Sequence, residues 1–259
     1  MAGIKIKTAD ELKLMRAACA VAAEVLDEIG AFIKPGLTTA QVDDFAADQI
    51  KARGAKSAFL GYRKYPRHVC ISVNEEVVHG LAGDRELRFG DVVSVDVGVL
   101  HKGFIGDNAR TFPVGGCGVL AQRLLDVTEQ ALYLGIAAAK PANHVTDISR
   151  AIQGFVENNG FSVVREFVGH GVGRTMHEEP QVPNFVDGNM NEKLRSGMTI
   201  AIEPMVNAGQ PGVKILKDNW TVVTQDGSLS AHFEHTILIT DGEPEILTCP
   251  ATHSKLKVA

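Results

Sequence analysis

The chain has 259 residues, of which 45% are hydrophobic and 22% charged, so it is long enough to bury a substantial core. No apolar run approaches the roughly 18 residues that a membrane helix needs, and residues 1–11 lack the apolar stretch of a secretory signal. The 26 basic and 31 acidic residues give a net charge of −5, which argues against a protein that neutralises nucleic-acid phosphates over a wide surface.

Two helical patterns open the chain. We predict a first helix over Ala9–Phe32. After Lys34-Pro35, apolar residues recur at the spacing of one helical face, and Gly54 stands where a C-terminal cap would end this second helix. The apolar positions of this face are Val42, Ala46 and Ile50.

A strand and its return follow. Residues 92–99 alternate, with valines on one face and Asp96 on the other. A tight turn at His101-Lys102 would place Asp96 opposite Asp107 in the returning strand. Because like charges at facing positions are destabilising, this pair is expected to bind a cation. The alternatives are that Asp107 only begins a turn, or that the register differs by one residue.

The second half of the chain repeats this plan. A helix is predicted over Val119–Ala139, and a Lys-Pro pair, an amphipathic stretch and a capping glycine recur 106 residues after their counterparts. The strand 198–203 ends on Glu203, 107 residues after Asp96. We therefore expect one α+β domain over residues 1–259, with an antiparallel sheet covered by helices. Its two pseudo-symmetric halves would span about 10–118 and 119–248, and chance similarity of two helix–strand units is the alternative.

A fourth carboxylate lies near the end of the chain. Asp226-Gly227 is a strong hairpin signal between the strands 219–224 and 232–239, and Glu234 interrupts the apolar run of the second strand. Alone, such a glutamate is typical of a solvated edge. Together with Asp96, Asp107 and Glu203 it predicts a site whose four negative charges two divalent cations would balance. This oxygen-rich donor set favours manganese, iron(II) or cobalt, with zinc or nickel as alternatives.

Three histidines are candidates for the same site. His170 is flanked by glycines that allow a close approach, His79 precedes a glycine, and His177 begins the run His177-Glu178-Glu179-Pro180. A single histidine is more often structural than functional. The remaining histidines are therefore assigned structural roles: His68, His101, His144, His232, His235 and His253.

These residues form an ordered series of motifs that extends over about residues 8–248. The motifs are Tyr62-Arg63-Lys64-Tyr65-Pro66, Val69 to Glu75 with Val78-His79-Gly80, Asp96-Val97-Gly98, Gly106-Asp107, Gly169 to Gly173, His177 to Pro180 and Ile202-Glu203-Pro204. With these motifs in this order, the chain resembles bacterial type I methionine aminopeptidases, which are members of peptidase family M24. The resemblance implies the pita-bread fold, which has a pseudo-two-fold axis.

The resemblance also implies a role for each site residue. The metal ligands would be Asp96, Asp107, His170, Glu203 and Glu234. The catalytic residues would be His79, His177 and Glu203. Residues that bind the substrate methionine would be Phe59, Tyr62, Tyr65, Cys70, His79, Met176, His177 and Trp220. Phe59 and Met176 stand where relatives often carry cysteine and an aromatic residue, and both remain apolar.

The implied activity is removal of the initiator methionine from nascent proteins whose second residue is small. A hydroxide bridging two divalent metal ions would attack, Glu203 would carry the proton, and His79 and His177 would donate hydrogen bonds to the scissile amide. The resemblance implies a monomer in transient contact with the ribosome, with no membrane or specific nucleic-acid partner. Four cysteines without a C-x-x-C pair favour the reducing cytoplasm.

Two related enzyme groups and one non-enzymatic class are alternatives. Prolidase-like enzymes share this scaffold but carry a substantial N-terminal domain, whereas here the core pattern begins within about ten residues. Type II methionine aminopeptidases carry a helical insertion for which the 31 residues from Glu203 to Glu234 leave no room. A metal-free binding protein on the same scaffold would be expected to have lost ligand residues.

Overall fold

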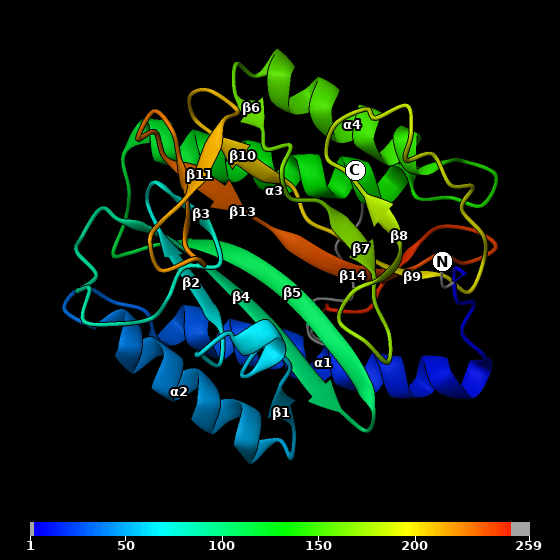
Figure 1. The fold of residues 1–259 in the computed structure, drawn as a ribbon, viewed down its shortest axis with the longest axis horizontal. Coiled ribbons are helices and arrows are strands. Elements are labelled where there is room, and N and C mark those ends of the chain that lie inside the picture. The colour runs from blue at the N-terminus through cyan, green and yellow to red at the C-terminus, as the bar shows by residue number, and fades with distance from the viewer. Residues whose placement is uncertain (1–2, 250–259) are drawn as a thin grey trace.

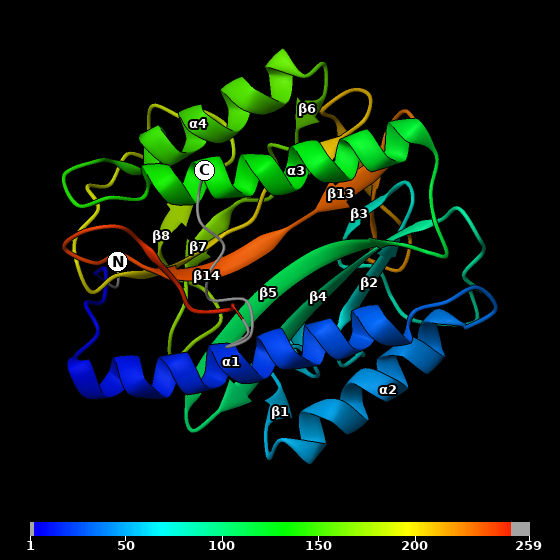
Figure 2. The same cartoon turned by 180° about the vertical axis from the view of Figure 1, so that it is seen from behind.

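Four helices lie on one side of a large sheet in the computed structural model, which describes residues 3–249 (Figures 1 and 2). The first, α1 (Ala9–Phe32), has the predicted bounds, and α3 (Val119–Ala138) ends one residue before its predicted end. Two shorter helices, α2 (Thr39–Ala52) and α4 (Val145–Asn158), follow the Lys-Pro pairs as expected. A short 3₁₀ turn spans Tyr62–Lys64.

Local chemistry explains where these helices begin and end. The hydroxyls of Thr8 and Thr38 accept hydrogen bonds from the third backbone N–H of α1 and α2, and the third side chain bonds back in each case. After α2 and α4, Gly54 and Gly160 adopt φ values of +66° and +77°, which a side chain would disfavour. The two halves therefore share the expected helix pattern.

All strand pairs of the sheets are antiparallel. The main sheet has the order β1-β4-β5-β14-β9-β7-β8, with β2 on β4 and β15 on β14, and two three-stranded sheets have the orders β13-β10-β6 and β11-β12-β3. The strands are β1 (Lys56–Ser57), β2 (Cys70–Val73), β3 (Glu76–Val78), β4 (Val92–His101), β5 (Phe104–Pro113), β6 (Ser162–Val163), β7 (Gly169–Gly171), β8 (Glu178–Val182), β9 (Thr199–Ile202), β10 (Met205–Asn207), β11 (Val213–Ile215), β12 (Val222–Thr224), β13 (Ser230–His232), β14 (Glu234–Leu238) and β15 (Glu245–Ile246).

The pairing of β5 with β14 joins the first half to the second within one sheet. The alternation predicted for residues 92–99 is confirmed, since four valines of β4 are fully buried in a cluster with residues of α1 and α2. A second cluster, built from α3, α4 and the strands of the second half, covers the other part of the sheet. The four helices leave the opposite face of the sheet uncovered (Figure 1).

The hairpin predicted at Asp226-Gly227 is wrong. The strand β12 pairs with β11 and β3, whereas β13 pairs with β10, so the two strands flanking this turn are not partners. The turn itself forms, with Gly227 at φ +76°. The Asp226 carboxylate accepts the N–H groups of Gln210 and Ser228, so it ties the turn to the segment after β10. No helix within residues 3–249 is long and apolar enough to cross a bilayer.

Candidate metal centre and adjoining pocket

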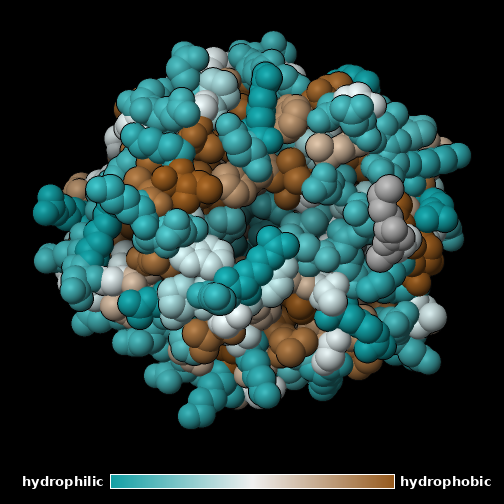
Figure 3. Space-filling view, in the orientation of Figure 1, coloured by the Kyte–Doolittle hydropathy of each residue, from teal (hydrophilic) through white to brown (hydrophobic). Residues whose placement is uncertain are grey.

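A cavity of about 230 Å³ lies on the face of the molecule seen in Figure 1. The space-filling view shows this face hollowed near its middle (Figure 3). Both halves of the chain contribute to the cavity wall. Every residue predicted for the site lies on that wall: Phe59, Tyr62, Tyr65, Cys70, His79, Asp96, Asp107, His170, Met176, His177, Glu203, Trp220 and Glu234.

The two aspartates do not face one another as predicted. In the β4–β5 pair, Asp96 lies opposite Ala109 and Asp107 lies opposite Gly98, so the register differs by two residues from the expected one. The turn is formed by Lys102 and Gly103 at φ +51° and +81°, and a glycine accepts this backbone conformation at low cost. Because the shift is two residues, both carboxylates still lie on the same face of the sheet.

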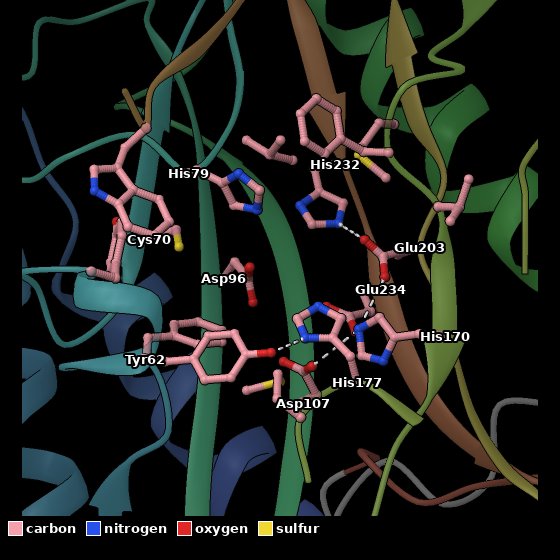
Figure 4. Close-up of a pocket in the computed structure, with 18 of the residues that line it drawn as sticks. Tyr62, Cys70, His79, Asp96, Asp107, His170, His177, Glu203, His232 and Glu234 are labelled. Atoms are coloured by element: carbon pink, nitrogen blue, oxygen red, sulfur yellow. Dashed lines mark hydrogen bonds and ion pairs between the residues drawn. The ribbon is translucent and has the colours of Figure 1, made fainter. Parts of the chain in front are cut away.

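Ala109 lies between two of the acidic residues. It pairs with Asp96 on one side and with Glu234 of β14 on the other, so its small side chain lies between two acids. Glu203 directly follows β9, which pairs with β14. Figure 4 shows Asp107, Glu203 and Glu234 gathered on one side of the cavity, with Asp96 near its centre.

His170 completes this group from β7. Its Nε2 lies 3.5 Å from Glu203 Oε1 and 3.8 Å from Asp107 Oδ2. Its Nδ1 lies 2.9 Å from the carbonyl oxygen of Gly171, which can only accept, so Nδ1 carries the ring proton. Burial lowers the pKa of His170 to about 3, which leaves a neutral ring with a free Nε2 lone pair. A side chain on Gly169 would collide with the carbonyl oxygen of Ala201, so the close strand packing needs that glycine.

The four acidic side chains of the site are buried, and burial disfavours their ionised form. Burial raises the pKa of Asp107 to about 7, and burial together with the charge of Asp107 raises the pKa values of Asp96, Glu203 and Glu234 well above their usual range. Within residues 3–249, one oxygen each of Asp96, Asp107 and Glu234 is buried without a hydrogen-bond partner.

A bound cation would remove this cost, because buried charges persist when they are paired or ligate a metal. Ligand atoms of Asp107, His170 and Glu234 lie within 4.8 Å of one another. The donor set and its unpartnered oxygens therefore fit a metal site.

His79 and His177 stand at the cavity beside this cluster. The ring of His177 lies 4.3 Å from that of His170, and its Nδ1 is 2.7 Å from the Tyr62 hydroxyl. His79 has a φ of +59°, and its ring contacts Phe167 edge-on. Burial, then the charge of His177, lowers the pKa of His79 to about 4. Both rings are thus held by neighbours and can donate or accept only as neutral imidazoles near pH 7.

Another part of the wall is apolar. The ring of Tyr65 packs edge-on against Trp220 at 5.0 Å and against Phe59 at 6.4 Å, and its hydroxyl donates to the carbonyl oxygen of Gly80. Cys70 and Met176 belong to the same buried cluster. This wall has the composition of a pocket for one apolar side chain.

The sequence predicts a structural role for His232, but His232 lies on the cavity wall. Its Nε2 is 3.8 Å from Glu203 Oε2 and is buried without a hydrogen-bond partner among the described residues. A usable signal is its position two residues before Glu234, since a separation of two puts side chains on one face of a strand. Arg63, Phe167 and Met205 also line the cavity.

Comparison with known proteins agrees with this geometry. Residues 13–241 match the model of metallopeptidase family M24. The chain is 50% identical to methionine aminopeptidase 1 of Bacillus subtilis (strain 168) over 242 residues, which are 93% of this chain and 98% of that protein. It is 48% identical to the methionine aminopeptidase of Escherichia coli (strain K12) over 247 residues, covering 95% and 94% of the two chains.

The fold of the chain is also close to that of a solved structure. The crystal structure of the methionine aminopeptidase from Thermotoga maritima has a TM-score of 0.93 at 46% identity, covering 95% of this chain and 99% of that one. The expected pita-bread fold is thereby confirmed. The chain belongs to metallopeptidase family M24 and, within it, to the type I methionine aminopeptidases.

Proposed function

We propose that this chain is a metal-dependent aminopeptidase that removes the initiator methionine from proteins whose second residue is small. The observation that carries the proposal is the buried carboxylate–imidazole cluster, directly beside an apolar pocket in one cavity. Family membership supports the same activity.

The proposed metal ligands are Asp96, Asp107, His170, Glu203 and Glu234. Four carboxylates balance two divalent cations in charge, and one imidazole among oxygen donors suits manganese, iron(II) or cobalt, with zinc or nickel as alternatives. When bound, such cations supply Lewis acidity and bring the pKa of a coordinated water toward neutrality. The unpartnered oxygens of Asp96, Asp107 and Glu234 support this assignment.

Glu203 is proposed to take the proton from the attacking water and later pass it to the leaving amine. Its carboxylate lies between His170 and His232, 3.5 and 3.8 Å from their Nε2 atoms. A general base in such a position contributes about 10²–10⁴-fold to the rate.

His79 and His177 are proposed to donate hydrogen bonds to the substrate amide as charge develops on it. When the Tyr62 hydroxyl donates to Nδ1 of His177, Nε2 of that ring carries the proton and is free to donate to substrate. The apolar wall, made of Phe59, Tyr62, Tyr65, Cys70, Met176 and Trp220, would hold the methionine side chain. A cavity of about 230 Å³ suits one residue, which supports exopeptidase action.

The substrates would be nascent polypeptide N-termini. We further propose that residues 1–259 act as one catalytic domain with halves at about 10–118 and 119–248, in monomeric form, in the cytoplasm and in transient contact with the ribosome. The four cysteines are free in the structure, which supports a reducing compartment.

The decisive experiment uses protein stripped with a chelator. Hydrolysis of the peptide Met-Ala-Ser should return after addition of manganese, iron(II) or cobalt, whereas the dipeptide Ala-Pro, a prolidase-type substrate, should stay intact. If Met-Ala-Ser also stays intact with every metal, the aminopeptidase proposal is wrong. Elemental analysis of protein purified without added salts identifies the native metal.

A further inference from the structure

The N-terminal segment contacts the loop that carries His177. In this segment, residues 3–8, the backbone N–H of Lys7 donates to the carbonyl oxygen of Gly197, two residues before β9, and the chain then enters α1 (Figure 1). The Nζ of Lys7 lies 2.9 Å from Glu178 Oε2, and the Nζ of Lys5 lies 3.2 Å from Glu178 Oε1. The side chains of Lys7 and Glu178 are only 5% and 2% exposed, whereas that of Lys5 is 51% exposed. A buried ion pair thus joins two segments 171 residues apart.

The Glu178 carboxylate also organises the loop itself. Its Oε1 accepts the backbone N–H groups of Arg174 and Thr175 at 3.1 and 3.4 Å. Burial raises the pKa of Glu178, but its hydrogen bonds and charge attraction with Lys7 and Lys5 outweigh burial and leave that pKa below its ordinary value. Glu178 is therefore an ionised acceptor for the loop backbone.

Gly173 makes room for this contact. A Cβ added there would lie 2.8 Å from Lys7 Cε and 2.9 Å from Glu178 Oε1, which is too close for real atoms. Arg174 gives the loop a second attachment to the N-terminal region, since its guanidinium donates to Glu11 of α1 and lies over the ring of Phe104. The loop is thus attached to the N-terminal region twice: by the buried ion pair of Lys7 with Glu178, and by the exposed contact of Arg174 with Glu11.

His177 directly precedes Glu178, so the position of its ring depends on the backbone that Glu178 holds. Its neighbour Met176 has an independent anchor, because its side chain is packed in the cluster that contains Phe59. On the cavity side, the ring of His177 is held by the Tyr62 hydroxyl and by contact with His170. Displacement of the loop would therefore move His177 more than the methionine pocket.

We infer that Glu178, held by Lys7 and Lys5 of the N-terminal segment, is a positioning residue that sets His177 against the reacting amide. This inference rests on the proposed aminopeptidase function. A displacement of about 1 Å can cost about 100-fold in rate. Because His177 would act in the transition state, its displacement lowers kcat and leaves KM nearly unchanged.

The first test compares Lys7→Met with Lys13→Met. Lys13 lies on the same N-terminal region but forms an exposed pair with Asp10, 74% and 89% exposed, so its loss should leave kcat within about twofold. Lys7→Met should lower kcat on Met-Ala-Ser about 100-fold with little change in KM. Lys5→Met, which keeps the buried pair and carries little risk to folding, should lower kcat about threefold. Unchanged kcat in both Lys5→Met and Lys7→Met would overturn the inference.

A double variant separates positioning from stability. Lys7→Met with Glu178→Met replaces both buried partners by apolar side chains, so the melting temperature should recover toward that of the unmodified protein. The acceptor for the Arg174 and Thr175 N–H groups stays absent, so kcat should remain about 100-fold low. Recovery of kcat together with the melting temperature would show that the pair only stabilises the fold, and the inference would be wrong.

Trypsin supplies a readout that does not depend on activity. Arg174 is 57% exposed, so a released loop should be cut between Arg174 and Thr175, and mass spectrometry would detect the cut. Cleavage there is expected in Lys7→Met and in the double variant, and not in Lys13→Met or the unmodified chain. Equal protection in all four would contradict the inference. If the unmodified protein leaves Met-Ala-Ser intact with each of manganese, iron(II) and cobalt, the proposed function fails, while this cleavage pattern still tests the contact.

Discussion

Gly98 lies directly behind the ring of Phe59. A Cβ added to Gly98 would stand 2.5 Å from Phe59 Cε1 and 2.8 Å from Met176 Cε, both of which line the apolar part of the cavity. Gly98 belongs to β4, two residues after Asp96. The width of the proposed methionine pocket is therefore set partly by an absent side chain.

Gly98→Ala should narrow this pocket. The new methyl group would push the Phe59 ring or Met176 into the cavity, because neither can retreat within a packed core. We expect KM for Met-Ala-Ser to rise about tenfold with a smaller change in kcat, since the lost contact binds substrate and transition state alike. Steady-state kinetics measure both constants. Adding Phe59→Ala should restore KM; a double variant as poor as Gly98→Ala alone would contradict the explanation.

Glu203→Gln should keep the fold and lose most turnover. Glutamine has nearly the same shape but cannot take a proton, so kcat should fall about 10²–10⁴-fold. The matched control is Glu157→Gln on α4, where the carboxylate only accepts a bond from Gln153. Circular dichroism checks the fold and peptide hydrolysis measures kcat. A fully active Glu203→Gln would exclude the proton-transfer role.

His79→Ala should lower kcat by about 10²–10³-fold with the metal content unchanged, because one donor to developing charge is lost. His101→Ala, at the end of β4, is the control. Kinetics and elemental analysis of the same preparation provide the test. Loss of bound metal in His79→Ala would instead identify His79 as a ligand.

The metal-free protein should lose stability as pH rises above about 7.5. Unfolded carboxyl groups lose their protons near pH 4, whereas burial raises the pKa of Asp107 to about 7 and raises those of Asp96, Glu203 and Glu234 as well. The folded state thus binds more protons, so stability falls as pH rises through the folded pKa values. Above about pH 7.5 the buried histidines are neutral in both states and add no opposing slope.

Metal should reverse this trend. For each carboxyl group that stays protonated only in the folded state, the free energy of unfolding falls by about 1.4 kcal/mol per pH unit. Manganese at 100 times its Kd adds about 2.7 kcal/mol to the free energy of unfolding. Manganese also binds more tightly as the carboxyl groups lose their protons. Melting temperatures with chelator and with manganese, taken between pH 7.5 and 8.5, should therefore diverge. A constant difference across this range would contradict the protonation argument.

The sequence alone determined the local elements. The helix over Ala9–Phe32 follows from its capping residues and apolar face, and the paired glycines Gly54 and Gly160 end the shorter helices, because caps and helical period depend on residues a few positions apart. Alternation likewise placed the valines of β4 on the buried face and Asp96 on the other. The motif series was specific enough to indicate the family.

Only the tertiary structure decided which distant residues meet. Asp96 lies opposite Ala109 rather than Asp107 because the turn formed at Lys102-Gly103, one residue later than expected. His232 lies near Glu203 because β13 pairs with β10 and β14 with β9, and the Asp226-Gly227 turn formed without pairing its flanking strands. Lys7 and Glu178, 171 residues apart, meet because packing buries them together. Such contacts depend on the summed burial of the whole chain, which local propensities do not contain.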